Sequence, residues 1–199
     1  MPTWSRGSPS AGWSLIAGSV YRWVQRFLPL FGASARAHRQ QVGRTWHVDE
    51  TYVRLNGTWT YIYRAIDQDG QVIDAYFSQR RNAAAARTFF ERAITETDVV
   101  PERVITDKAK CYPHALRAIL PGVEHRRSKY LNNELERDHQ HFKQRVYSMR
   151  GFKNAVAAAT LCRGHALIQN LRNGFSTLTA TIPRCLRLAA AWSQLAQAI

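Results

Sequence analysis

The N-terminal part of the chain carries apolar residues at the period of a helix. Between Leu15 and Leu30 they recur at spacings of three and four positions, while Arg22 and Arg26 fall on the other side. The apolar positions are Val20, Trp23, Val24, Phe27 and Leu28. We therefore expect a helix over Leu15–Leu30 with a basic face. A Ser/Gly/Pro-rich loop is expected at 1–14 and a linker at 32–45.

From Thr45 onward the hydrophobic period changes to two, which is typical of strands. Asn56-Gly57 and Asp69-Gly70 separate three runs rich in β-branched and aromatic residues, and both dipeptides favour tight hairpin turns. The predicted strands are Trp46–Leu55, Trp59–Asp67 and Val72–Ser78. This part of the chain is expected to form an antiparallel meander.

The following segments alternate between helical and strand patterns. They predict a helix over Ala83–Thr97, a buried strand over Arg103–Thr106, a helix over Tyr112–Leu120, a strand over Val123–His125, helices over Asn132–Met149 and Lys153–Asn173, and a short helix with a tail in 176–199. Three hairpin-linked strands followed by helix, strand, helix, strand and helix is the order of a ribonuclease-H-like fold. We expect an α/β protein with a mixed sheet flanked by helices.

The amino-acid composition argues against several classes of protein. A hydrophobic content of 45% in 199 residues argues against global disorder. No apolar run reaches the length of about 18 residues that spans a membrane, and the N-terminus lacks the pattern of a signal peptide. The three cysteines form no CxxC pair, so neither a disulfide framework nor a cysteine zinc site is indicated. We expect a cytoplasmic protein that does not act at a membrane.

The formal net charge of +14 is concentrated at the two ends of the chain. All 14 acidic residues lie between Asp49 and Asp138, whereas residues 1–48 and 139–199 contain basic residues and no acid. Solubility alone is served by mixed charges, so the purely basic flanks indicate a polyanionic partner. Double-stranded DNA fits this charge, and we expect the protein to be associated with the nucleoid.

Three acidic residues lie where the predicted topology brings them together. Asp49 lies inside the first strand, Asp107 ends the short buried strand, and Glu136 lies near the start of the next long helix. Clustered carboxylates are unfavourable unless hard cations neutralise them. We therefore predict a catalytic site that holds two Mg²⁺ ions, with Mn²⁺ as a substitute, for displacement at a phosphodiester.

Several segments in this order resemble the DDE transposases of bacterial insertion sequences, and among them the replicative, cointegrate-forming insertion-sequence six family. They are Trp46-His-Val-Asp-Glu-Thr-Tyr, Tyr63-Arg-Ala-Ile-Asp, Thr106-Asp-Lys-Ala, Val123-Glu-His-Arg, Lys129-Tyr-Leu-Asn-Asn-Glu-Leu-Glu-Arg-Asp-His and Met149-Arg-Gly-Phe-Lys. The resemblance extends over about Ser19 to Asn173. It implies that Asp49, Asp107 and Glu136 form the catalytic and metal-binding triad.

The resemblance also implies the partners. Lys143 takes the place of the basic residue that follows the family's glutamate on the same helix face, where it would contact phosphate. The other predicted DNA contacts are Arg22, Arg26, Lys108, Arg126, Arg127 and Lys129. The implied substrates are the terminal inverted repeats of the element and its target DNA. A homodimer is expected, because two ends must be brought together.

The resemblance and the charge pattern together divide the chain into three predicted segments. Residues 1–44 are predicted to be a basic segment with a short helical remnant of a helix-turn-helix, 45–175 the DDE domain, and 176–199 a basic tail. The expected activity is strand cleavage at element ends followed by strand transfer. Two alternatives stay open: a nuclease of the same fold without strand transfer, and a truncated, catalytically impaired transposase that acts as a DNA-binding protein.

Overall fold

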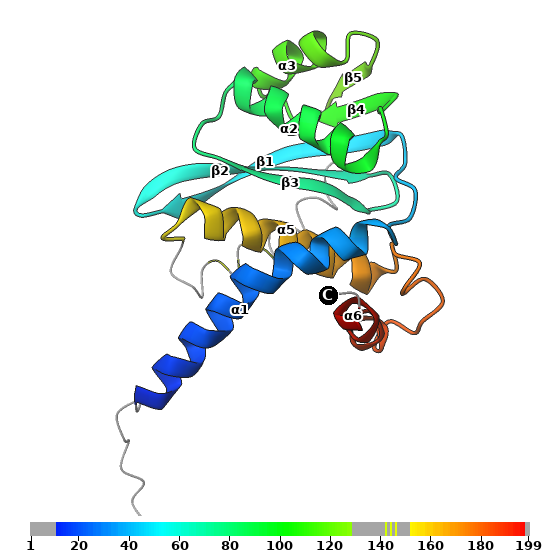
Figure 1. Cartoon of the computed structure of the whole chain (residues 1–199). Helices are drawn as coiled ribbons and strands as arrows, with labels where there is room; N and C mark the ends of the chain where they lie inside the picture. The colour runs from blue at the N-terminus through cyan, green and yellow to red at the C-terminus, as the bar shows by residue number, and fades with distance from the viewer. Residues whose placement is uncertain (1–10, 129–141, 143, 145, 147–151, 198–199) are drawn as a thin grey trace, which may run out of the picture.

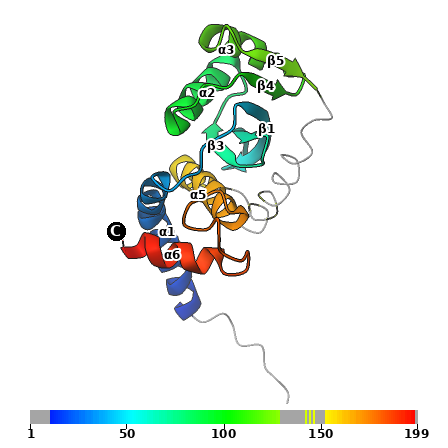
Figure 2. The same ribbon diagram turned by 90° about the vertical axis from the view of Figure 1, so that its right-hand side faces the viewer.

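The computed structural model describes residues 11–128, 142, 144, 146 and 152–197. In this part of the chain, a five-stranded sheet lies between two layers of helices (Figures 1 and 2). The strands are β1 (Thr45–Leu55), β2 (Thr58–Asp67), β3 (Val72–Ser78), β4 (Arg103–Thr106) and β5 (Glu124–Arg127). The helices are α1 (Ala11–Arg36), α2 (Ala83–Thr97), α3 (Cys111–Ile119), α5 (Ala155–Asn173) and α6 (Arg187–Gln197).

The strands are arranged in the order β3-β2-β1-β4-β5. β1, β2 and β3 pair antiparallel, whereas β4 pairs parallel to both β1 and β5. The predicted meander and the mixed sheet of a ribonuclease-H-like fold are therefore confirmed. β5 begins and ends slightly later than the predicted Val123–His125.

Both predicted hairpin turns form. Asn56 and Gly57 have φ values of 47° and 80°, as a two-residue hairpin turn with two left-handed positions requires. At the second turn, one Asp67 carboxylate oxygen accepts hydrogen bonds from the backbone N–H groups of Asp69 and Gln71, at 3.0 and 2.8 Å. These turns fix the register in which β1, β2 and β3 pair.

One face of the sheet is covered by α2 and α3 (Figure 1). Its buried core includes Trp46 and Tyr63 from the sheet, Phe89 and Phe90 from α2, and Tyr112 from α3. Asn82 caps the start of α2 by accepting a hydrogen bond from the Ala85 N–H at 2.8 Å. This layer packs against β1, which contains Asp49, and against β4, which ends just before Asp107.

The opposite face is covered by α5, with α1 running alongside α5 and α6 packed at its end (Figures 1 and 2). Asn170 joins α5 to strand β3 of the sheet. Its side chain accepts a hydrogen bond from the Val72 N–H at 2.7 Å and donates one to the Val72 carbonyl at 2.8 Å. No helix in the described ranges is long and apolar enough to cross a membrane.

The N-terminal helix is longer than predicted. The sequence indicated Leu15–Leu30 with a loop before it and a linker after it, but the observed helix runs over Ala11–Arg36 and includes Pro29. Proline normally ends a helix because it lacks the N–H donor. Here Phe31 stacks on Trp192 of α6, with ring centroids 4.4 Å apart, and Ala35 is buried beside α5 and α6. These contacts stabilise the turns beyond Pro29.

The predicted helix over Asn132–Met149 lies mostly outside the described residues. Phe142, Gln144 and Val146 are described there and are helical. Phe142 and Val146 are buried against the α5 face of the sheet, together with Val53 and Ile62. The following helix begins two residues later than predicted, because Asn154 caps it through the Val156 N–H.

Candidate active site

Two acidic residues from separate parts of the chain meet where β4 ends beside β1. Val48 pairs with Thr106 in the parallel register, so Asp49 and Asp107 are the next residues along the two strands. Carboxylate oxygens of Asp49, Glu50 and Asp107 lie within 4.8 Å of one another. The predicted proximity of Asp49 and Asp107 is therefore present in the structure.

Backbone N–H groups orient both aspartates. The Asp49 Oδ1 accepts a hydrogen bond from the Glu50 N–H at 2.8 Å, and the Asp107 Oδ1 accepts one from the Ala109 N–H at 2.9 Å. Both residues are half-buried. Each carboxylate is thus fixed by the local chain while it remains reachable from solvent.

Glu50 is the third acidic residue of this cluster and was not among the predicted site residues. Its side chain is 4% exposed, forms an ion pair with Arg81, and accepts a hydrogen bond from the Tyr112 hydroxyl. Burial raises the pKa of the Glu50 carboxyl, although Tyr112 and Arg81 oppose this shift. Burial and the neighbouring Glu50 carboxylate raise the pKa of Tyr112 well above its ordinary value. Tyr112 therefore stays a hydrogen-bond donor.

The alternation of side chains along β1 could have drawn attention to Glu50. Trp46 and Val48, which are fully buried, lie on the same face of the strand as Glu50. A glutamate at the next position of a buried face requires a partner. The partner, Arg81, comes from the loop between β3 and α2, and no local pattern in the sequence marked it.

The structure describes only part of the predicted site. Glu136, Lys129 and Lys143 lie outside the described residues. The triad therefore stays a prediction: the structure brings Asp49 and Asp107 together and does not describe Glu136.

The other predicted DNA contacts all lie on the surface. Arg22 and Arg26 are exposed on α1, and Lys108 is exposed directly after Asp107. Arg126 and Arg127 are exposed on the edge strand β5, where Arg126 pairs with Glu124 at 2.6 Å. Hydrogen bonds from Arg103 and Arg126 lower the pKa of the Glu124 carboxyl, so this acid stays ionised and offsets part of the positive charge.

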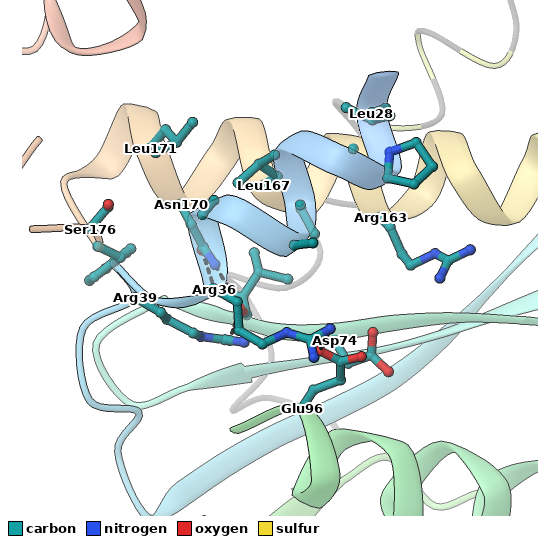
Figure 3. A pocket seen from close by; sticks show the side chains of 18 of the residues that line it. Leu28, Arg36, Arg39, Asp74, Glu96, Arg163, Leu167, Asn170, Leu171 and Ser176 are labelled. Carbon is teal, nitrogen blue, oxygen red and sulfur yellow. Dashed lines mark hydrogen bonds and ion pairs between the residues drawn. The ribbon is translucent and has the colours of Figure 1, made fainter. Parts of the chain in front are cut away.

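A separate hollow of about 210 Å³ lies where α1 meets β3 and α5 (Figure 3). Arg36 from α1 pairs with Glu96 from α2 at 2.7 Å, and Arg39 donates hydrogen bonds to the Val72 and Ile73 carbonyls at 2.5 and 3.0 Å. None of the three clustered carboxylates lines this hollow. These contacts attach the end of α1 to α2 and the residues directly after α1 to β3.

Comparison with known proteins agrees with this geometry. A family model described as a DDE domain matches residues 43–175. Two Staphylococcus aureus proteins, the transposase for the insertion sequence-like element IS431mec and the transposase for the insertion sequence element IS257 in transposon Tn4003, are each 36% identical to the chain over 132 residues. The match covers 64% of this chain and 58% of each relative.

The chain belongs to the DDE-domain family of insertion-sequence transposases, in the insertion-sequence six group that its motifs predicted. It spans a little over half the length of these relatives. Among solved structures, the catalytic core domain of BIV integrase is similar, with a TM-score of 0.46 and 18% identity over 65% of this chain and 84% of that chain.

Proposed function

We propose that this chain catalyses metal-dependent DNA strand cleavage at the ends of an insertion sequence and joins the freed ends to target DNA. The observation that carries the proposal is the meeting of Asp49 and Asp107 at the end of the parallel pairing of β1 and β4. Glu136 is proposed as the third member of the triad. Family membership supports these assignments, because the matched segment includes all three residues.

The donor atoms of the described site suit a hard divalent cation. Aspartate oxygens are the ligands that Mg²⁺ prefers, and the carboxylate oxygens here approach one another closely enough to share an ion. Asp49, Asp107 and Glu136 would hold two Mg²⁺ ions, which Mn²⁺ can replace. Bound there, the ions would activate the attacking oxygen and stabilise the negative charge that develops on the leaving oxygen.

One site can serve both reactions. In cleavage, a water oxygen attacks phosphorus and the 3′ oxygen leaves; in strand transfer, that 3′ hydroxyl attacks a phosphodiester of the target and displaces another 3′ oxygen. Only the attacking group differs. Arg22, Arg26, Lys108, Arg126 and Arg127, together with Lys129 and Lys143, would hold the phosphates of terminal repeats and target.

The proposed partner, besides DNA, is a second copy of the chain. Large apolar side chains are exposed along α1 and offer a surface for such contact. They are Val20, Tyr21, Trp23, Phe27 and Leu30. Sedimentation of the full chain tests this proposal, and a dimer is expected. A monomer at micromolar concentration would contradict it. Because the substrate is chromosomal or plasmid DNA, the nucleoid is the proposed site of action.

The decisive experiment uses the DNA that flanks the coding region as a substrate. The full chain is incubated with Mg²⁺, an end duplex and a supercoiled target plasmid, and products are resolved by length. Joined end–target molecules are expected. Cleavage without joining would favour a nuclease, and binding without cleavage would favour a DNA-binding protein.

A further inference from the structure

Arg81 connects the buried glutamate of the acidic cluster to one of the aspartates. Its guanidinium forms an ion pair with the Glu50 Oε1, and the same nitrogen lies 3.7 Å from the Asp107 Oδ2. Arg81 belongs to the loop between β3 and α2, whereas Glu50 lies on β1 and Asp107 follows β4. Three separate segments therefore meet at this side chain.

Both carboxylate oxygens of Glu50 are already engaged within the protein. Arg81 contacts the Oε1, and the Tyr112 hydroxyl donates to the Oε2. The side chain is 4% exposed, compared with 34% for Asp107. A cation that bound Glu50 would have to displace these contacts in a buried place, whereas Asp107 is open to solvent.

Asp107 has a contact at each oxygen. The Ala109 N–H holds the Oδ1 at 2.9 Å, and Arg81 faces the Oδ2. Asp49 is held through the Glu50 N–H, so the backbone of Glu50 orients one aspartate and its side chain acts on the other through Arg81. Contacts of this kind around metal-binding residues orient the ligands.

We propose that Glu50 and Arg81 are positioning residues of the active site: Glu50 anchors Arg81, Arg81 holds the Asp107 carboxylate beside Asp49, and Glu50 itself is not a metal ligand. This inference rests on the proposed function, because it concerns the metal that Asp49 and Asp107 would share. Of the three clustered carboxylates, Asp49 and Asp107 are then the metal ligands, and Glu50 neutralises the charge of Arg81.

Replacing Glu50 and Arg81 together separates the effect of their charges on cation binding from the effect of their positions. Removing Arg81 alone leaves a buried negative charge that attracts cations, and removing Glu50 alone leaves an unpaired positive charge that repels them. In the double variant Glu50→Gln with Arg81→Met the net charge of the pair stays at zero. A loss of cation affinity in that variant therefore reports position rather than charge.

The test measures binding of Mn²⁺ to the DNA-free full chain by electron paramagnetic resonance. We expect the double variant to bind on the order of tenfold more weakly than the wild type, the usual size of an effect from residues that orient ligands. The matched control is Arg87→Met, which removes an exposed arginine from a surface pair with Glu91 on α2 and should leave affinity unchanged. Unchanged affinity in the double variant overturns the inference.

A second measurement uses the wild-type protein and does not depend on the folding of a variant. Anomalous diffraction from crystals soaked in Mn²⁺ should place the ion on oxygens of Asp49 and Asp107, with Glu50 still paired to Arg81 and Tyr112. An ion coordinated by Glu50 overturns the inference but leaves the proposed function standing. Equal Mn²⁺ affinity in wild type and Asp49→Asn rejects the metal site, and with it both the proposed function and this inference.

Discussion

Asp107 is the first residue after β4, and it lies beside Asp49 at the point where β1 continues without its parallel neighbour. β1 extends to Leu55, whereas β4 ends at Thr106. A carboxylate in a central strand would normally be buried at a high free-energy cost. Because β4 ends here, Asp49 lies within a central strand and is only half-buried.

The first prediction concerns these two carboxylates. Asp49→Asn and Asp107→Asn should each lower metal-dependent cleavage more than about a hundredfold, because each would remove a charged ligand of the proposed metal site and not merely a residue that orients one. Duplex DNA binding should be unchanged or slightly tighter, since a negative charge near phosphate is lost. Cleavage rates and gel-shift titrations of the same preparations check this.

The matched control is Asp98→Asn. Asp98 is an aspartate at the C-terminus of α2 in the left-handed conformation, which asparagine also accepts. Its variant should cleave as the wild type does. Glu136→Gln tests the third position in the same assay, and cleavage within tenfold of wild type there would show that another residue completes the triad.

The second prediction concerns the exposed arginines of α1. Binding to duplex DNA should weaken steeply with salt, and the slope of log K against log salt should become less negative by about 2 in the double variant Arg22→Gln with Arg26→Gln, because each phosphate contact contributes about 0.9. Arg87→Gln is the control, since Arg87 is already paired with Glu91 at 2.8 Å. Fluorescence anisotropy between about 50 and 200 mM salt measures the slopes. If the wild type and the α1 variant had the same slope, these arginines would not contact DNA phosphates.

The third prediction uses the cysteines as reporters of burial. Burial raises the pKa of the Cys111 thiol to about 11 and that of the Cys162 thiol to about 12, whereas Cys185 is exposed. Only the thiolate reacts with iodoacetamide, so at pH 8 the native protein should be labelled at Cys185. Labelling of Cys111 should increase as the pH rises from 8 toward 11, when its thiolate forms. Peptide mass spectrometry identifies each site, and rapid labelling of Cys162 at pH 8 would contradict its burial.

The sheet could be predicted because its signals are local. Asn56-Gly57 sets a hairpin by backbone conformation alone, and the change of hydrophobic period at Thr45 marks where the strands begin. The meeting of Asp49 and Asp107 followed from topology, since each aspartate comes directly after a residue of the Val48–Thr106 pair in two neighbouring parallel strands.

Long-range partners could not be read from the sequence. Nothing near Arg81 indicates that it pairs with Glu50, because the two are joined only by the packing of the β3–α2 loop over β1. The extension of α1 past Pro29 has the same cause, since it depends on Trp192 far along the chain. Both features depend on tertiary contact, and at Pro29 that contact overrides the local signal for the end of a helix.

The last prediction tests the contact that seats α1 on α5. A Cβ at Gly164 would overlap the side chain of Leu28, whereas a Cβ at Gly32 would meet nothing within 4 Å. Both glycines lie inside helices, where alanine is favoured by about 1 kcal/mol. Gly32→Ala should therefore raise the free energy of unfolding, and Gly164→Ala should lower it by roughly 1–3 kcal/mol, the usual effect of overpacking.

A double variant shows whether the clash is the cause. Leu28→Ala removes the side chain that the new methyl group would meet, so adding it to Gly164→Ala should destabilise the protein by less than the sum of the two single changes. Urea unfolding followed by tryptophan fluorescence measures all four variants. If Gly164→Ala instead stabilised the protein as much as Gly32→Ala does, then α1 would not rest against α5 at this position, because helix propensity alone would account for both results.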